Sequence, residues 1–520
     1  MANPTYPRFN TQLALMAGIP WDRSYKHLRR FASPEERNAF VLSKQLFSVG
    51  DISYIRPFDP KPIRVELDQE QLAKCNYIMF HNDIDMWYFA FVTDISYLAD
   101  GTSEISFELD WWTTYQFDLH VKPCMVEREH VANDSIGRHT VPEDIECGPL
   151  TVERESFDDL GGLVTVLAAT MDYMTHKAFR GNTVNNVFTG LGYYNSTVAN
   201  METYIQAYIE EGLQDAIILL YMAPQRAIMA EYPDAPESYF QITPNFSTIG
   251  GYAPKNKKLF CWPYHYLTVQ NNAGSSNDYR FEQWTRTTPG VDPKPAGYYF
   301  YDDCSYVTMA EALAVPLGYK GMEKNYGESL LLNNFPQCAF SGDTFRTWWA
   351  QNKSVFTYNR AKQGITGVIG GVMSALSGNV GGIAGGIGSV VDATLGAELE
   401  KERMEALPDS FKGTAQAASI MARNSRVGFT FQEMSITAEY ARKIDDFFTM
   451  FGYKIMRLKQ PDMTSRASWN YVKTIGAEVY GAVPEFVVQA FVNRLDSGVW
   501  FWHTDDVGNF SLANGIVEVG

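Results

Sequence analysis

The sequence predicts a β-rich α+β fold with one long hydrophobic, glycine-rich loop inserted into it. Aromatic side chains make up 14% of the 520 residues, and they favour strands over helices. Over the first 150 residues, short apolar runs alternate with turn residues, which is typical of antiparallel sheets. The stretch GITGVIGGVMSALSGNVGGIAGGIGSVV, residues 364–391, contains ten glycines and no charged or aromatic side chain. It therefore differs from the globular sequence on both sides of it.

Residues 1–150 are expected to form the N-terminal part of a β-rich domain. NYIMFHN (76–82) and MWYFAFVTDISYL (86–98) are rich in β-branched and aromatic residues and predict strands. ADG at 99–101 predicts a tight turn, and SEISFELDWWTTYQF (103–117) alternates like the returning strand. This part is expected to be mostly sheet and barrel-like.

Residues 151–345 are expected to form an α+β insertion. GLVTVLAAT (162–170) and AIILLYM (216–222) predict buried strands. Between them, NMETYIQAYIEEGL (200–213) predicts a helix that Asn200 caps at its N-terminus. Its apolar residues recur at helical spacing and predict one buried face: Met201, Tyr204, Ile205, Tyr208 and Ile209.

Two later patterns complete the outline. YLTVQNNAGSSNDYRFEQW (266–284) has two alternating arms around a Gly/Ser/Asn turn and predicts a hairpin. After residue 428 the mixed pattern returns, with a helix near 435–451 and strands beyond it. Residues 431–520 are therefore expected to complete the first domain, and residues 346–430 to form the inserted loop region.

Charge and cysteine usage exclude several classes of function. The formal net charge of −17 argues against general nucleic-acid binding, because phosphate contacts need clustered cations. An acidic surface can still serve DNA by repelling it, as the wall of a smooth conduit would. No basic region followed by a long apolar run opens the sequence, so synthesis in a cytoplasm is expected. The scattered cysteines predict buried thiols rather than disulfides or a zinc site: Cys75, Cys124, Cys147, Cys261, Cys304 and Cys338.

Motifs of catalysis are absent from the sequence. It contains no P-loop, no G-x-S-x-G, no H-E-x-x-H and no G-x-G-x-x-G after a strand. The stretch EREHVANDSIGRH (127–139) gathers carboxylates and histidines that could suggest a metal: Glu127, Glu129, His130, Asp134 and His139. A polar connection between strands explains it better, because no metal-ligand spacing is present. Neither a metal nor a cofactor is expected, and the protein is not expected to be an enzyme.

The length of the apolar stretch 364–391 decides how it can meet a membrane. As one helix its 28 residues would span about 42 Å at about 1.5 Å per residue, more than the roughly 30 Å of bilayer hydrocarbon. If Ser377, Gly378 and Asn379 formed a turn, each arm would reach only about 20 Å. Each glycine costs roughly 0.8–1 kcal/mol against alanine in a helix, so the stretch is a poor helix in water.

Three interpretations of this stretch compete. It is a permanent transmembrane helix, a glycine-rich segment packed in the interior or in the channel of an oligomer, or a shielded loop that becomes active at a membrane. The first fits poorly with the globular sequence on both sides. The last two are compatible, because a loop stored in a channel can later be expelled.

Several blocks of the sequence are distinctive. They are GIPWD (18–22), ISFELDWWTTYQFDLHVKPCMVEREHV (105–131), DTFRTWWAQNKS (343–354), ITAEYARKIDDFFTMFGYKIMRLKQPDMTSRASWNYVKTIGAEVYGAVP (436–484) and FWH (501–503). These blocks resemble the distal tail, or tail-knob, proteins of small short-tailed bacteriophages of the phi29-like type. The matching blocks cover most of residues 1–150 and 430–505, whereas residues 151–335 match only loosely.

The resemblance implies barrel-like or sandwich domains that form a tube in a ring-shaped, hexameric tail assembly. Phage DNA would pass through the lumen without specific binding, and adjacent lower collar or tube proteins would be partners. Residues 151–345 would form the outer knob. The protein would sit in the virion at the distal end of the tail, after synthesis in the cytoplasm of the host bacterium. Two alternatives stay open: a receptor-binding adhesin, and a tail-tip enzyme that degrades cell wall or polysaccharide.

The resemblance also implies that a long hydrophobic loop plugs the tube and is released to perforate the host cytoplasmic membrane. In this sequence the loop is residues 346–430, with its apolar core at 364–391. The side chains expected to insert are Ile365, Val368, Ile369, Val372, Met373, Leu376, Val380, Ile383, Ile387, Val390 and Val391. The glycines expected to give conformational freedom and close packing are Gly367, Gly370, Gly371, Gly378, Gly381, Gly382, Gly385, Gly386 and Gly388.

Overall fold

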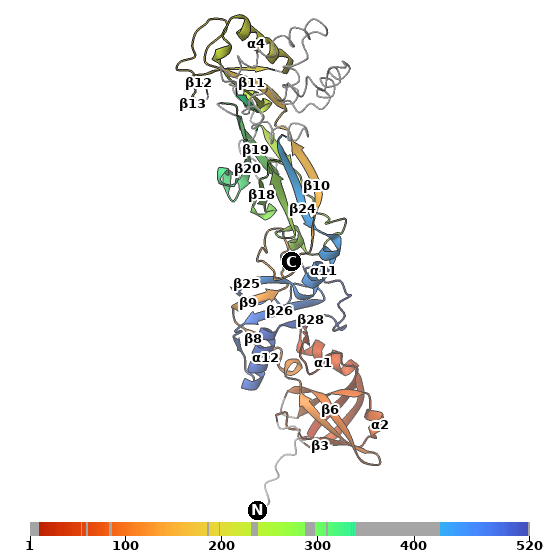
Figure 1. The fold of residues 1–520 in the computed structure, drawn as a ribbon. Helices are drawn as coiled ribbons and strands as arrows, with labels where there is room; N and C mark the ends of the chain where they lie inside the picture. The colour runs from red at the N-terminus through yellow and green to blue at the C-terminus, as the bar shows by residue number, and fades with distance from the viewer. Residues whose placement is uncertain are drawn as a thin grey trace, which may run out of the picture. The chain divides into compact units, whose positions relative to one another are not determined.

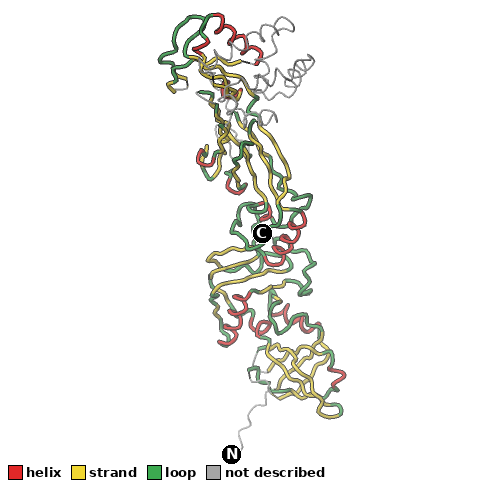
Figure 2. The backbone as a smooth tube through the Cα atoms, in the orientation of Figure 1, coloured by secondary structure: helices red, strands yellow, loops and turns green. Residues whose placement is uncertain are grey.

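Strands outnumber helices among the residues that the computed structural model describes (Figures 1 and 2). These residues are 10–53, 55–58, 61–82, 86–184, 187–196, 198–229, 238–285, 297–307, 310–333, 335, 337–339 and 427–517. Two units make up the chain. Unit 1 comprises Met1–Cys147, Pro254–Leu259 and Glu439–Gly520, and unit 2 comprises Gly148–Ala253 and Phe260–Ala438. The prediction of a β-rich fold is confirmed.

The N-terminal sheet of unit 1 has the antiparallel order β3-β1-β5-β6-β7-β4. Its strands are β1 (Asn10–Ala17), β3 (Gln45–Ser53), β4 (Ile63–Val65), β5 (Cys75–Asn82), β6 (Trp87–Ala99) and β7 (Thr102–Leu109). The predicted strands at 76–82 and 86–98 are therefore confirmed. The turn predicted at 99–101 joins β6 to β7, where Gly101 takes a positive φ of 71°.

In the middle of this sheet, at β5, both faces are buried, and side chains alternate between two cores. On β5, Ile78 and Phe80 belong to one core while Tyr77 and Met79 belong to the other. Because successive side chains point to opposite faces, a strand covered on both faces reads as a continuous apolar run. The second core is closed by α1 (Pro34–Ser43), whose first turn is capped by the Ser33 hydroxyl.

The returning strand ends earlier than the sequence predicts. β7 stops at Leu109, and the following WWTTY forms a short helix, α3 (Trp111–Tyr115). Asp110 causes the change, because one of its carboxylate oxygens accepts the backbone N–H groups of Trp112 and Thr113, each at 3.1 Å. The prediction of strand over residues 110–117 is therefore wrong.

The other carboxylate oxygen of Asp110 connects α3 to the N-terminal sheet. It accepts the Trp21 indole N–H at 3.1 Å, the Tyr77 hydroxyl at 2.7 Å and the Thr113 hydroxyl at 2.7 Å. With the two backbone groups, five donors converge on one fully buried carboxylate. This interaction positions the two aromatic side chains on which the second core is built.

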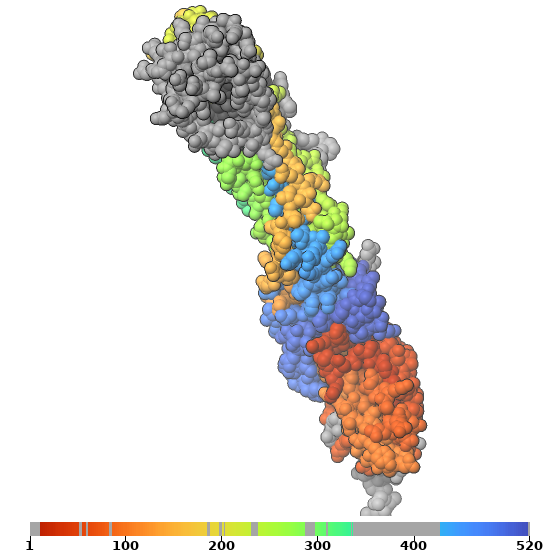
Figure 3. Space-filling view, turned by 45° about the vertical axis from the view of Figure 1, so that its right-hand side comes forward, coloured from red at the N-terminus to blue at the C-terminus, as the bar shows by residue number. Residues whose placement is uncertain are grey.

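A second sheet of unit 1 draws strands from both ends of the chain. Its order is β2-β28-β26-β9-β25, from β2 (His27–Arg29), β9 (Cys124–Glu129), β25 (Tyr453–Lys459), β26 (Trp469–Ile475) and β28 (Val499–Trp502). β8 (His120–Val121) pairs separately with β27 (Val479–Tyr480). Figure 3 shows the C-terminal residues in violet against the N-terminal residues in red and orange. Unit 1 therefore depends on residues more than 300 positions apart in sequence, such as Glu129 opposite Val472.

Three helices complete unit 1. They are α2 (Gln69–Leu72), α11 (Ala438–Phe451, whose first residue belongs to unit 2) and α12 (Glu485–Ser497). The helix predicted near 435–451 is thus confirmed, with a start three residues later. On α12, the buried side chains Val487, Phe491 and Leu495 recur every fourth residue and join the first core.

The described residues of unit 2 form three sheets and a small hairpin. The first has the order β10-β24-β17-β18, from β10 (Leu150–Asp158), β17 (His265–Gln270), β18 (Ser276–Tyr279) and β24 (Phe429–Ile436). The second, β14-β11-β15-β23, contains β11 (Leu163–Ala169), β14 (Gly192–Ser196), β15 (Ile217–Pro224) and β23 (Gln337–Ala339). The third contains β16 (Tyr239–Ile242), β19 (Tyr298–Ser305), β20 (Glu311–Tyr319), β21 (Met322–Lys324) and β22 (Leu330–Leu332). β12 (Thr183–Val184) and β13 (Val187–Phe188) form the hairpin.

The predicted features of unit 2 are confirmed with one correction. β17 and β18 form the expected hairpin, and β11 and β15 are the expected buried strands. The helix α4 (Val198–Glu210) buries Met201, Ile205 and Tyr208 as expected. It begins at Val198, however, so Asn200 lies inside the first turn and is not the N-cap residue. A second helix, α5 (Gln225–Met229), follows β15, and 3₁₀ turns occupy Gln214–Ala216, Lys257–Phe260, Phe281–Gln283 and Tyr326–Glu328.

Two buried carboxylates of unit 2 share one arginine. Arg226 at the start of α5 pairs with Asp158 at 2.7 Å and also with Asp302 on β19. Ser238 donates its hydroxyl to Asp302 at 3.2 Å. Burial and the neighbouring Asp158 carboxylate raise the pKa of Asp302 to about 8. At neutral pH the carboxylate pair therefore holds a proton.

Replacing Asp110 by asparagine is expected to destabilise unit 1. Donors approach both carboxylate oxygens, so the asparagine NH₂ must face donors whichever way the amide is turned. The free energy of unfolding should fall by at least about 2 kcal/mol in denaturant titrations of the full chain. The control Asp94→Asn makes the same chemical change at an exposed position of β6 and should stay within about 0.5 kcal/mol. An Asp110→Asn protein as stable as the parent would contradict the inference that hydrogen bonds to the Asp110 carboxylate stabilise unit 1.

The stability of unit 2 is expected to fall as pH rises from about 4 to about 8. The folded state holds the Asp302 proton up to a pKa of about 8, whereas the unfolded chain releases it near 3.8, so raising the pH favours unfolding. Thermal unfolding across this range should show the trend, and Asp302→Asn should weaken it because asparagine does not titrate. Asp159→Asn, at an exposed neighbouring position, is the control. An unchanged pH profile for Asp302→Asn would show that other groups carry the dependence.

Candidate functional site

The residues expected to insert into a membrane lie outside the described residues. The apolar core 364–391 falls within residues 340–426, which the structure does not describe. The same is true of the side chains expected to insert and of the glycines expected to give conformational freedom. The structure describes the chain on either side: Ala339 ends β23, and Val427 and Gly428 precede β24. Among the described residues, no helix is long and apolar enough to cross a membrane.

The strand before this range lies at the edge of a sheet. β23 pairs antiparallel with β15, with Ala339 opposite Leu219 and Gln337 opposite Tyr221. Along its other edge, β15 pairs with β11. The chain therefore leaves the described part of unit 2 from the edge of the second sheet.

The strand after this range lies in the middle of a sheet. β24 pairs with β10 on one side and with β17 on the other, and in Figure 1 it is the blue strand beside the orange β10. Phe429 and Phe431 are fully buried in the core of unit 2. The chain returns at a fixed position, because β24 is hydrogen-bonded along both edges.

Gly428 fits closely at the start of β24. It has a φ of +151°, and an added Cβ would lie 2.1 Å from the Asp158 carbonyl oxygen. A larger residue there would displace the backbone of β10. The Gly428 carbonyl oxygen accepts a hydrogen bond from the Asn272 side chain at 3.1 Å, and Asn272 also accepts the Thr430 hydroxyl at 3.0 Å. These contacts fix the last residues before the strand.

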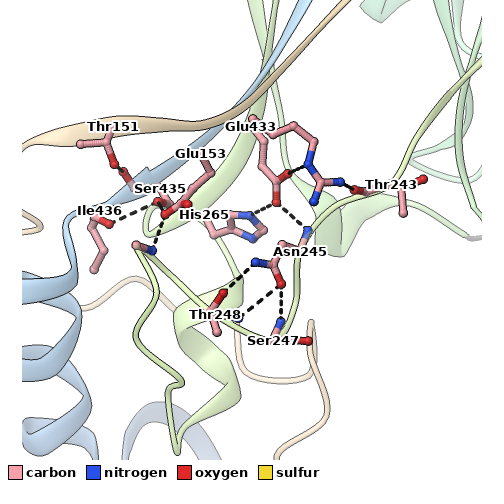
Figure 4. Close-up of polar contacts among 12 residues, drawn as sticks. Thr151, Glu153, Thr243, Asn245, Ser247, Thr248, His265, Glu433, Ser435 and Ile436 are labelled. Atoms are coloured by element: carbon pink, nitrogen blue, oxygen red, sulfur yellow. Dashed lines mark hydrogen bonds and ion pairs between the residues drawn. The ribbon is translucent and has the colours of Figure 1, made fainter.

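A buried polar cluster lies at the opposite end of β24 (Figure 4). His265 Nε2 lies 2.8 Å from a Glu433 carboxylate oxygen, which also accepts the backbone N–H of Asn245 at 2.7 Å. Burial opposes ionisation of Glu433, but the hydrogen bonds from His265 and Asn245 outweigh it and hold the pKa below its usual value. The charged carboxylate thus binds the loop that contains Asn245 to the sheet.

A second carboxylate holds the same loop. Glu153 on β10 accepts the Ser435 hydroxyl at 2.7 Å and the backbone N–H of Gly250. Within the loop, the Asn245 side chain accepts the Ser247 N–H at 2.9 Å and donates to the Thr248 hydroxyl at 2.8 Å. Residues from three separate parts of the sequence therefore converge here, namely β10, residues 245–265 and β24. No sequence motif predicted this cluster.

The combination of serine, histidine and glutamate in this cluster invites comparison with a hydrolase triad. His265 and Ser435 are opposite each other on β17 and β24. The Ser435 hydroxyl, however, donates to Glu153 and not to His265, and the Ser435 and His265 side chains are buried. A nucleophilic serine needs its base within hydrogen-bond reach and access to substrate. The cluster therefore acts in structure rather than in catalysis.

The stretch 127–139 is used in separate structural contacts. His130 is buried, accepts the Tyr471 N–H at Nδ1 at 2.7 Å and donates from Nε2 to the Thr449 carbonyl at 3.0 Å. Burial lowers its pKa to about 3, so it stays neutral. Glu129 pairs with Lys459.

The other polar side chains of this stretch are engaged in the same manner. Asp134 accepts the Tyr453 hydroxyl at 2.6 Å and the Lys257 N–H at 2.9 Å. Glu127 pairs with Lys473 at 2.8 Å. Within the described ranges, no group of three His, Cys, Asp or Glu side chains could hold a metal ion. The interpretation as a polar connection agrees with these contacts.

Comparisons with known proteins identify the family. The family described as "Bacillus phage phi29, Tail knob protein gp9, C-terminal domain" matches residues 229–515, more than half of the chain. "Caudoviral major tail protein N-terminus" matches residues 9–120. The chain is 23% identical to the tail knob protein gp9 of Bacillus phage phi29 and to that of Bacillus phage PZA, in each case over 98% of this chain and 99% of the relative.

A solved structure has the same fold. The bacteriophage C1 tail knob protein gp12 superimposes with a TM-score of 0.62 at 15% sequence identity, over 98% of this chain and 100% of that one. The names of these relatives describe a structural tail protein and no enzyme. The chain therefore belongs to the family of phi29-type tail knob proteins, which are structural components of the phage tail.

Proposed function

We propose that six copies of this chain form a conduit at the tip of the phage tail through which DNA is ejected. Unit 1 is the tube-forming domain in this proposal, and its second sheet combines strands from residues 1–150 with strands from residues 431–520. Residues 151–345 form the outer knob in this proposal. The net charge of −17 supports a lumen on which DNA phosphates find few cations, so that DNA slides without specific binding.

The second part of the proposal concerns residues 346–430. Their hydrophobic loops plug the channel, and on release they insert into and perforate the host cytoplasmic membrane. The observation that carries this step is the apolar core 364–391, which has ten glycines and no charged side chain. A stretch of this composition gains little from helix formation in water but can transfer apolar surface into lipid.

The described ends of this range support the proposed role. The chain enters from the edge strand β23 and returns to the central strand β24, both in unit 2. Gly428 and Asn272 fix the return. With both ends held by folded sheets, the segment between them can change its conformation or environment without unfolding the strands that carry it.

Deleting residues 364–391 is expected to leave assembly intact and to abolish membrane perforation. The deletion ends well away from β23 and β24, so the hexamer should keep the mass of six chains on analytical ultracentrifugation. Dye release from liposomes should fall to the level of buffer alone, because the apolar surface that inserts is gone.

The control for this deletion keeps the length of the loop. Replacing Ile365, Ile369 and Met373 by serine should reduce dye release, whereas replacing Ser374 and Ser377 by alanine should not. Liposome leakage by the deleted protein at the rate of the full-length protein would refute the role of the loop. A mass other than that of six chains would refute the hexamer and leave the loop to be judged by leakage alone.

A further inference from the structure

A long segment of unit 2 carries no acidic residue in an otherwise acidic protein. Residues 173–201 contain neither Asp nor Glu, although the chain has 60 of them in 520 residues. The same segment contains Lys177 and Arg180, and both side chains are exposed. This acid-free segment is therefore locally cationic on a protein of net charge −17.

The acid-free segment passes through two turns that leave the same end of one sheet, and the first of them begins just before the segment, at Met171 and Asp172. Ala169 is opposite Gly192 at the end of the β11–β14 pair, and the chain between them forms both turns. The first is closed by the bridge between Met171 and Ala178. The second is the β12–β13 hairpin, which Figure 1 shows near the end of β11.

Each turn presents one large apolar side chain to solvent. Met174 and Phe188 are each 71% exposed, more than the other exposed methionines and phenylalanines of the described residues. A single exposed apolar residue needs no explanation, but two in neighbouring turns, close in sequence to two exposed cations, form a pattern. It is the pattern of proteins that lie at a lipid surface, where apolar tips enter the interface and cations pair with phosphates.

The first turn holds the backbone of its exposed methionine in a fixed position. Asp172 accepts the backbone N–H of Met174 at 3.1 Å, the Thr175 hydroxyl at 2.6 Å and the Tyr194 hydroxyl at 2.9 Å. Tyr173, the next residue, packs against the Tyr194 and Tyr208 rings at 5.7 and 5.2 Å. Because its neighbours on both sides are engaged, the backbone of Met174 has little conformational freedom left to lose on binding.

The acidic group within the first turn, Asp172, and a neighbouring one, Glu211, are engaged as well. The Asp172 carboxylate accepts the three hydrogen bonds described above, and Glu211 pairs with the exposed His176 at 3.2 Å. Neither Lys177 nor Arg180 forms an ion pair with another described residue. The two cations are therefore available to an anionic partner.

We propose that the turn at 171–178 and the two described strands of the β12–β13 hairpin dock onto an anionic phospholipid surface. Met174 and Phe188 enter the interfacial region, and Lys177 and Arg180 contact the headgroup phosphates. An acidic protein is repelled by an anionic bilayer over most of its surface, so the contact has to be made by a locally cationic part. A water-soluble anionic polymer would use the two cations but would gain little from the apolar tips, which is why the lipid surface fits better.

The inference rests on the proposed function in one respect, namely that the protein meets the host membrane. It assigns a different task to different residues: surface attachment by the two turns, perforation by the loop. If six copies assemble, six such contacts act together, so a weak single contact suffices for attachment.

Flotation of the full chain with vesicles tests the proposal, with the 364–391 deletion used in parallel. Both proteins should bind phosphatidylglycerol vesicles and bind phosphatidylcholine vesicles at least about tenfold more weakly, and added salt should weaken the binding. In the deletion background, M174S/F188S should reduce binding to phosphatidylglycerol vesicles at least about tenfold, and K177Q/R180Q should do the same and remove the salt dependence. The matched control M322S/L331S changes two exposed apolar residues elsewhere in unit 2 and should bind as the deletion protein does.

Two outcomes would overturn the inference. Unchanged vesicle binding by M174S/F188S would show that the two apolar side chains do not enter the lipid interface, even if K177Q/R180Q lost binding through its missing cations. Failure of the deletion protein to bind any vesicle would show that the turns do not attach the protein to lipid at all. Dye release measures perforation by the loop, whereas flotation measures attachment by the turns. The two assays therefore distinguish an error in the proposed role of the turns from an error in the proposed role of the loop.

Discussion

Strand β24 is hydrogen-bonded along both of its edges, and this double pairing constrains the rest of unit 2. A strand in the middle of a sheet cannot shift its register without moving its side chains to the opposite face. Its pairing with β10 and β17 joins residues 150–158, 265–270 and 429–436 in one sheet. Whatever residues 340–426 do, the chain must return to this position.

Polar residues support this position at both ends of β24. At its start, Gly428 leaves no room for a side chain beside Asp158, and Asp158 shares Arg226 with Asp302. At its other end, Glu433 binds His265 and the loop at Asn245. Buried charged groups of this kind are costly unless every one is paired, so they specify one arrangement more than they add stability. The chemistry of the described residues is thus that of a scaffold.

A scaffold suits a protein whose proposed activity is conformational. Perforation requires a segment of poor intrinsic helix propensity to change its environment, while the sheets that carry it stay folded. The proposed docking turns also combine a fixed support with an exposed group. Asp172 and Tyr173 hold the backbone of the turn, while the Met174 side chain is exposed to solvent. Attachment and perforation would then be carried by different residues, each held by a folded sheet at its base.

The sequence by itself determined the local structure wherever one period dominated. Alternation over 266–284 predicted a hairpin, and the 3.6-residue spacing of Met201, Ile205 and Tyr208 predicted a helix, because these patterns depend only on which face is buried. Tertiary structure decided the rest. WWTTY reads as strand by composition and becomes helix because Asp110, buried against Tyr77, caps it. His265 and Glu433 meet across 168 positions of sequence, and no local pattern encodes a contact that exists only once two strands pair.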